Sequence, residues 1–106
     1  MAKRKYRKFR EVEEDYFRKR PDEIDDYLTE IFDEFAKDGN TSALLSSLRV
    51  VCRVKGISEI ARETGITRNG IQKALSEDGN PKLENINAIM HAMGYRLVPQ
   101  KLEHPQ

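Results

Sequence analysis

The central part of the chain carries apolar residues at the spacing of helices. From Ile24 to Phe35 they fall at i, i+3, i+4, i+7, i+8 and i+11, and acidic residues occupy most positions between them. This is the pattern of an amphipathic helix that buries one stripe of side chains. Pro21 and the two acidic residues after it favour a helix start, and Gly39 suits the left-handed position at a helix end. The sequence therefore predicts a helix over 22–38.

The same periodicity predicts four further helices before Gly94. Their starts are marked by residues such as Asn40 or Thr41, whose side chains can accept free N–H groups at a helix terminus. The four expected helices cover about 40–56, 58–64, 67–75 and 82–93. The residues expected to be buried in the first and last of them are Leu44, Leu45, Leu48, Val51, Cys52, Leu83, Ile86, Ile89 or Met90, and Met93. We therefore expect an all-α protein, a five-helix bundle that contains a short helical hairpin.

The two ends of the chain do not follow this helical pattern. The apolar residues of 1–21 hold no single period, so this segment is expected to be irregular or strand-like. Alternating residues predict a short strand over 95–98, ended by a proline. We therefore divide the chain into a basic N-terminal arm (1–21), a helical domain (22–98) and a polar C-terminal tail (99–106) that is expected to fray.

Composition narrows the class of protein. The chain has 106 residues, of which 35% are charged and 38% apolar, which fits a single domain with one core. No apolar run approaches the roughly 20 residues of a membrane-spanning helix, and the basic N-terminus lacks the apolar stretch of a secretory signal. Cys52 is the single cysteine, so no intrachain disulfide can form. We expect a protein of the reducing cytoplasm, without membrane contact.

The balanced net charge of +1 hides three segments of different sign. Residues 1–21 hold nine basic and four acidic side chains, residues 22–38 hold one and eight, and residues 39–106 hold nine and six. The net charges are therefore +5, −7 and +3. This asymmetry indicates charged partners, although the segments could also solvate the surface or pair with each other.

Residues 57–76 carry the strongest functional signal. Ala61, Gly65 and Ile71 follow the spacing Ala-x3-Gly-x5-Ile. Two helices that cross at about 90–120° leave room for little more than a methyl group, and their turn needs a residue free to take positive φ. The spacing predicts a helix-turn-helix, whose core residues would be Ile60, Ala61, Gly65, Ile66, Ile71 and Leu75. The alternative is a helical hairpin that serves only the fold.

A helix-turn-helix places its second helix in the major groove of DNA. Here that helix is 67–75, and its exposed side carries guanidinium, ammonium and amide groups that can pair with base edges. The expected base contacts are Arg68, Asn69, Gln72 and Lys73. The expected phosphate contacts, from helix starts and nearby cations, are Ser58, Thr67, Lys55, Arg62 and Lys82. Gly70 has two open interpretations, a close approach to DNA or close packing against a neighbouring helix.

One short helix reads only a few base pairs, so useful specificity usually needs two copies one turn of DNA apart. We therefore expect a homodimer on double-stranded DNA. Enzyme activity, a metal site and a cofactor are not expected. The sequence has no phosphate-binding loop, no Cys/His set with metal spacing and no nucleophile beside a general base.

Several short segments are typical of a known family. The most distinctive is Lys73-Ala74-Leu75-Ser76 followed by Gly79-Asn80-Pro81. The other matching segments are Tyr27-Leu28, Leu44-Leu45, Gly56-Ile57-Ser58, Ile60-Ala61-Arg62-Glu63-Thr64-Gly65, Thr67-Arg68 and Ala92-Met93-Gly94. On these segments, residues 57–94 resemble the phage-repressor-like (XRE/Cro-type) helix-turn-helix class. More narrowly, about 25–98 resemble the addiction-module antidote family of bacterial toxin–antitoxin systems.

The resemblance implies an antitoxin that binds a small RelE-like toxin, typically a ribosome-dependent mRNA endonuclease, and represses its own operon through the helix-turn-helix. Two features depart from the family pattern: the arm 1–21 is longer, more basic and more aromatic, and Gln72 replaces an aromatic residue. A basic toxin would suit the acidic helix 22–38. The candidate toxin contacts are Asp25, Asp26, Glu30, Asp33 and Glu34, and a solvated helix face is the alternative.

Two other functions stay open, a stand-alone regulator and a protein-interaction module without DNA binding. A DNA affinity that falls steeply with salt would indicate a DNA-binding regulator and not a protein-interaction module. A small basic partner gene next door would favour an antitoxin over a stand-alone regulator. The arm 1–21 has three open interpretations: it could enter the minor groove, pair with 95–98, or be disordered.

Overall fold

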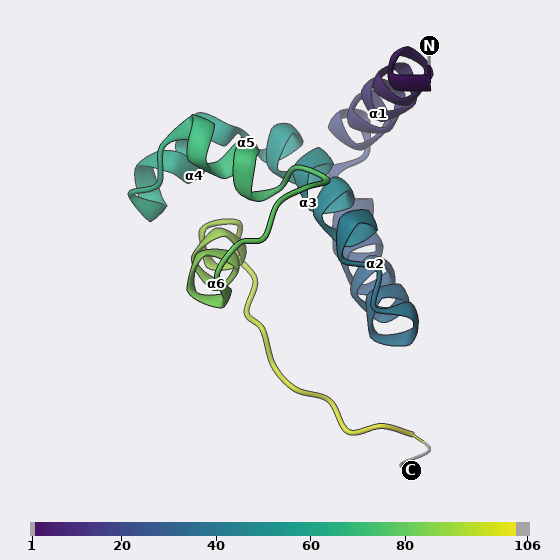
Figure 1. The fold of residues 1–106 in the computed structure, drawn as a ribbon, viewed down its shortest axis with the longest axis vertical. Coiled ribbons are helices and arrows are strands. Elements are labelled where there is room, and N and C mark those ends of the chain that lie inside the picture. Colours follow the sequence, from purple (N-terminus) through teal and green to yellow (C-terminus); the bar gives the residue numbers. More distant parts are fainter. Residues whose placement is uncertain (1, 104–106) are drawn as a thin grey trace.

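Six α-helices and one 3₁₀ turn make up the part of the chain that the structure, a computed structural model, describes: the backbone of residues 2–103 and the side chains of residues 10–103. The elements are α1 (Ala2–Lys19), η1 (Pro21–Glu23), α2 (Ile24–Asp38), α3 (Thr41–Lys55), α4 (Ile57–Thr64), α5 (Arg68–Ala74) and α6 (Leu83–Ala92). In Figure 1, α3 crosses the centre, with α1 and α2 on one side and the short helices α4, α5 and α6 on the other. The all-α class is confirmed, and the described residues form six helices, not the five expected.

Helix α1 replaces the irregular or strand-like arm expected over 1–21. Glu14 and Phe17 are buried, and Arg10 and Glu13 are half-buried. These positions are spaced i, i+3, i+4 and i+7, as on one face of a helix, and α1 packs against α3. Three of the four residues are charged, so a search for apolar periodicity misses the helix.

Aromatic side chains join α1 to α2. The ring centre of Phe17 lies 4.5 Å from that of Tyr27 and 5.2 Å from that of Tyr16, the second pair in an edge-to-face arrangement. The Tyr27 hydroxyl donates to Glu13 Oε2 (3.3 Å), and the Tyr16 hydroxyl donates to Glu23 Oε1 (2.7 Å). The hydrogen bond to Glu23 raises the pKa of Tyr16, whereas burial is the main reason why the pKa of Tyr27 is raised.

Helix α3 supplies the centre of the core. Leu48, Val51 and Cys52 have no exposed area, as predicted, and Val50 is also buried because α1, α2 and α4 all contact α3. The Cys52 thiol lies 3.7 Å from the sulfur of Met93 on the far end of the chain. Burial raises the pKa of Cys52 to about 12, so the reactive thiolate is rare at neutral pH.

The C-terminal part of the chain corrects two expectations. Leu83, predicted to be buried, is 75% exposed, because α6 turns Ile89 and Met90 toward the core instead. Residues 95–98, predicted as a strand, have no strand partner, and no strand occurs within residues 2–103. A strand in the N-terminal arm is also wrong, because that segment is α1. The extended chain after α6 instead runs away from the helices (Figure 1).

Side-chain caps confirm two of the predicted helix starts. Asn40 Oδ1 accepts a hydrogen bond from the Ala43 N–H (3.1 Å) at the start of α3. Thr67 Oγ1 accepts one from the Gly70 N–H (2.9 Å) at the start of α5. Helix α4 begins one residue before Ser58, so no side chain caps it.

Candidate nucleic-acid interface

The turn between α4 and α5 is held by a glycine and a threonine. Gly65 has a φ of 76°, in the left-handed region where any side chain would be strained. The Thr64 hydroxyl donates to the Ile60 carbonyl (2.8 Å) and accepts from the Ile66 N–H (3.1 Å). The chain therefore reverses within the few residues up to Thr67, and the two helices are fixed relative to each other.

The inner face of this hairpin is apolar. Ile71 and Leu75 have no exposed area, and Ile60 is buried. Ala61 and Ile66 are half-buried and pack against the same core, and α4 contacts α3, α5 and α6. The predicted core residues of the hairpin thus pack together, while the turn glycine is exposed.

The outer face of α5 is polar. Arg68, Asn69 and Lys73 are exposed, and their side chains form no hydrogen bond or ion pair within residues 10–103. A Cβ placed on Gly70 would lie 3.0 Å from the Thr67 hydroxyl and from a side chain of the turn. The crowding at Gly70 therefore comes from the turn directly before α5 and not from a neighbouring helix. Three of the four predicted base-contact side chains are thus free to meet a ligand.

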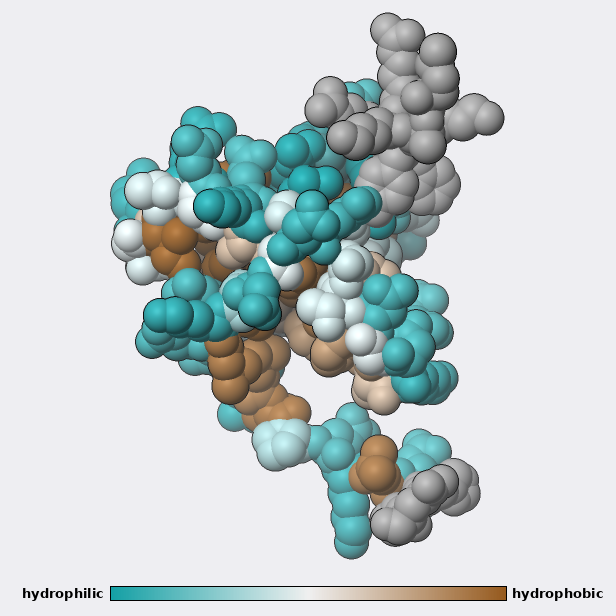
Figure 2. Space-filling model, in the orientation of Figure 1, coloured by the Kyte–Doolittle hydropathy of each residue, from teal (hydrophilic) through white to brown (hydrophobic). Residues whose placement is uncertain are grey.

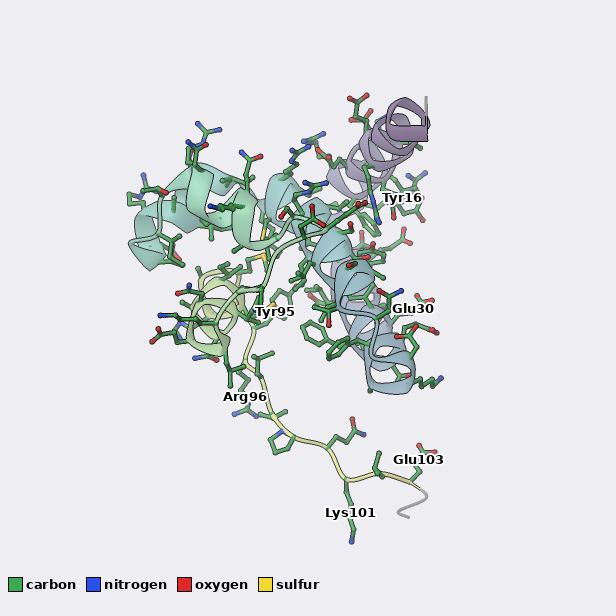
Figure 3. The ribbon with its side chains drawn as sticks, viewed as in Figure 1. Tyr16, Glu30, Tyr95, Arg96, Lys101 and Glu103 are labelled. Atoms are coloured by element: carbon green, nitrogen blue, oxygen red, sulfur yellow. The ribbon has the colours of Figure 1, made fainter. Side chains whose placement is uncertain are left out.

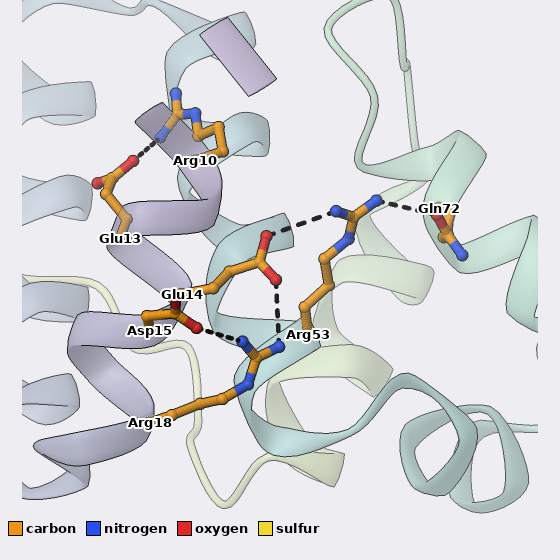
Figure 4. Close-up of polar contacts among 7 residues, drawn as sticks. All are labelled: Arg10, Glu13, Glu14, Asp15, Arg18, Arg53 and Gln72. Carbon is orange, nitrogen blue, oxygen red and sulfur yellow. Dashed lines mark hydrogen bonds and ion pairs between the residues drawn. The ribbon is translucent and has the colours of Figure 1, made fainter. Parts of the chain in front are cut away.

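The fourth, Gln72, is half-buried and belongs to a polar network (Figure 4). Arg53 Nη2 donates to Gln72 Oε1 (3.4 Å), and Arg53 Nη1 lies 3.4 Å from Glu14 Oε2. The buried Glu14 also accepts a hydrogen bond from Arg18 Nη2 (3.2 Å). The contacts run from α1 through α3 to α5, and they turn the amide oxygen of Gln72 toward Arg53.

We expect Glu14→Gln to lower the free energy of unfolding by about 1 kcal/mol, because it removes the charge shared by two guanidinium groups and keeps the side-chain volume. Urea unfolding measures this loss. A double-mutant cycle with Arg53→Gln should give a coupling of about 0.5–1 kcal/mol. Glu11→Gln, exposed on the same helix, is the control and should change the free energy by less than about 0.5 kcal/mol. Equal losses at Glu14 and Glu11 would contradict the network.

Three predicted phosphate contacts lie at helix starts. Ser58 stands in the first turn of α4, Thr67 at the start of α5 and Lys82 directly before α6, and all three are exposed. The hydroxyl of Thr67 is already used as the cap of α5. The first N–H groups of a helix are free of helical partners and are aimed at any anion that approaches.

The two other predicted phosphate contacts have partners within the chain. Arg62 Nη2 lies 3.2 Å from Glu59 Oε1, and both side chains are well exposed. The ammonium of Lys55 lies 5.2 Å from the ring centre of Tyr95. Exposed ion pairs contribute little to stability, so Arg62 can exchange its carboxylate for a phosphate at small cost. Lys55 is directed instead toward the chain that follows α6.

The five predicted toxin contacts all lie exposed on α2. The Tyr95 hydroxyl donates a hydrogen bond to Asp25, and Asp33 lies 3.6 Å from the Lys37 ammonium. Burial, together with the Asp25 hydrogen bond, raises the pKa of Tyr95 to about 12. The side chains of the other three residues, Asp26, Glu30 and Glu34, make no hydrogen bond or ion pair within the described residues. Glu30 and Tyr95 are labelled in Figure 3.

Sequence reasoning missed two residues that support this surface. Arg53 is exposed, yet it bridges α1 and α5. Glu14 carries one signal in the sequence, its i, i+4 spacing from Arg18, which favours an ion pair on a helix. That signal applies only once residues 2–19 are known to be helical.

Comparison with known proteins shows to which family the chain belongs. A sequence model of the family described as probable addiction module antidote protein matches residues 8–101. The chain belongs to this family. The match begins inside α1 and ends in the extended chain after α6, so nearly all of the described fold lies within it.

A relative of this antidote-family chain comes from Haemophilus influenzae (strain ATCC 51907 / DSM 11121 / KW20 / Rd). It is an uncharacterized protein that is 38% identical over 80 residues, which are 76% of this chain and 78% of the relative. No solved structure matches the chain. Among the described helices of this antidote-family chain, none combines the length and apolar content that a membrane span requires.

Proposed function

We propose that the chain is a sequence-specific DNA-binding antitoxin that neutralises a small, basic, RelE-like toxin and represses its own operon. Membership of the antidote family supports the antitoxin role. The outer face of α5 carries the proposal of DNA binding. There Arg68, Asn69 and Lys73 are exposed and without partners within the described residues, on a helix anchored from below by the buried Ile71.

In this proposal α4 and α5 act as a helix-turn-helix, and α5 enters the major groove. Arg68 and Lys73 would donate to guanine O6 and N7, and Asn69 would pair with adenine. Because the oxygen of Gln72 faces Arg53, its NH₂ group is the part best placed to meet a base. Phosphates would be held by the exposed starts of the helices and by Arg62.

The test is binding of the full chain to the DNA upstream of its own gene, measured by fluorescence anisotropy at two salt concentrations. We expect Arg68→Ala or Lys73→Ala to weaken specific binding by about 1–3 kcal/mol, because each removes a donor to base edges. Lys37→Ala removes an exposed cation on α2 and is the matched control, with no change in site preference. Wild-type protein without any site preference, or equal effects of the three substitutions, would contradict DNA reading by α5.

The antitoxin part is tested on the acidic face of α2. Reversing the charge of the three unpaired carboxylates Asp26, Glu30 and Glu34 to lysine should weaken binding of the basic toxin about tenfold or more, because attraction becomes repulsion. DNA affinity should stay unchanged. The reversal Glu11→Lys, at an exposed position on α1, is the control. Loss of both activities, or of neither, counts against a toxin site on α2.

The two experiments together separate the alternatives. DNA binding with no toxin partner would indicate a stand-alone regulator. Toxin binding without DNA binding would indicate a protein-interaction module in which α4 and α5 serve only the fold.

A further inference from the structure

An apolar groove lies between α2 and the C-terminal segment, which we define as residues 95–102. Its volume is about 520 Å³. The larger apolar residues that line it are Leu28, Phe32, Phe35, Met90, Leu97 and Val98. Figure 2 shows it as a hollow below α2 and α6 with hydrophobic side chains on both walls. An open groove of this kind marks a site that a further chain can fill.

The C-terminal segment is held by hydrogen bonds at its first residue and by the half-buried Leu97, which packs against the core. The Tyr95 N–H donates to the Met90 carbonyl (2.9 Å), and the Tyr95 hydroxyl donates to Asp25. Beyond it, the described backbone makes no hydrogen bond to another element. The side chains of Val98 and Leu102 are 63% and 68% exposed. An extended segment with free N–H and C=O groups and exposed apolar side chains is a template for strand pairing.

We propose that the C-terminal segments of two copies of this chain pair as antiparallel strands about a twofold axis, so that each copy covers the apolar groove of the other. A twofold interface sets the same patch of two copies face to face, which requires a self-complementary patch. This segment carries Arg96 and Lys101 and no acidic residue. The charged residues that line the groove are Asp33 on α2 and the segment's own Arg96, so the basic segment of one copy can approach Asp33 of the other.

The sequence of the segment selects one register. With Val98 on the twofold axis, Arg96 faces Gln100 of the second copy and Tyr95 faces Lys101, so no like charges are opposed. If Val98 is a hydrogen-bonded pair, Pro99 lies at a position whose N–H would point out of the ladder. The missing N–H of the proline then costs no hydrogen bond.

This inference deepens the proposed function, because it supplies the two copies of α5 that a specific DNA site needs. The observations that support the proposed dimer do not involve DNA, and the experiment that tests the dimer contains no DNA. A failure of this interface therefore leaves DNA reading by α5 intact, and the reverse also holds.

The test is sedimentation velocity of the full chain over a wide range of concentration. We expect a monomer–dimer equilibrium in which Val98→Glu raises the dimer dissociation constant about tenfold or more, because it buries a charge at the centre of the ladder. The matched control is Leu83→Glu, which changes another exposed apolar residue, outside the groove, and should leave the dissociation constant unchanged. Val98 is exposed in the single chain, so the Val98→Glu variant should keep the helix content of the wild type, measured by circular dichroism.

Cross-linking gives a second measurement. Val98→Cys should form disulfide-linked dimers on mild oxidation, whereas Leu83→Cys should not. The native Cys52 is fully buried and does not compete. A chain that stays monomeric without its toxin would overturn the proposal and leave the groove to another partner. A dimer that is insensitive to Val98→Glu, or equal cross-linking at the two positions, would overturn it as well.

Discussion

Phe17→Ala is expected to lower the free energy of unfolding by about 3 kcal/mol, the lower end of the range for truncation of a buried phenylalanine. Phe17 is 7% exposed, and its ring centre lies 4.5 Å from that of Tyr27 on α2. The substitution removes these contacts and leaves a cavity where α1 meets the core. We expect the low end because α1 has a neighbour on one side only and can shift inward. Urea unfolding followed by circular dichroism measures the loss.

Val12→Ala is the control on the same helix. Val12 is 66% exposed, so its truncation should change the free energy of unfolding by less than about 0.5 kcal/mol. If the two substitutions had equal effects, α1 would contribute nothing to the stability of the domain. It would then behave as the separate basic arm that the sequence predicts.

Gly79→Ala should destabilise the protein by about 2–3 kcal/mol through overpacking. A Cβ at this position would lie 2.3 Å from the carbonyl oxygen of Ala74 and 2.9 Å from that of Ser76. These are backbone atoms and cannot move aside as a flexible side chain does. The turn is also tied in place, since the Gly79 N–H donates to the Ser76 carbonyl (2.9 Å) and Ser42 Oγ donates to the Glu77 carbonyl (3.0 Å).

Gly70→Ala is the matched control, because a Cβ there would meet only side-chain atoms, at 3.0 Å. Alanine gains about 1 kcal/mol over glycine inside a helix, which offsets this moderate crowding. We therefore expect a net change within about 1 kcal/mol. Thermal unfolding of both variants checks the comparison. A Gly79→Ala variant as stable as wild type would show that the 76–81 turn adjusts freely.

The sequence predicts most helices because their signals are local. The helix over 22–38 follows from apolar spacing, and α2 ends at Asp38 as expected, with Gly39 at a φ of 65° after it. The N-terminal segment was not predictable in the same way. The inward face of α1 contains Arg10, Glu13 and Glu14, and charged residues do not show which face of a helix is covered. The prediction that Leu83 is buried was wrong for the opposite reason: the residue is apolar, but an apolar residue in the first turn of a helix need not face the core.

The sequence by itself therefore determined the all-α class, the limits of α2 to α6 to within about two residues and the spacing of the α4–α5 hairpin. Each of these depends on residues within a few positions of one another. The tertiary structure decided what depends on distant residues: the docking of α1, the bridge from Glu14 through Arg53 to Gln72, and the unpaired C-terminal segment. A polar network across three helices or a missing strand partner leaves no periodic trace in a sequence, because its energy arises only when separate elements are brought together.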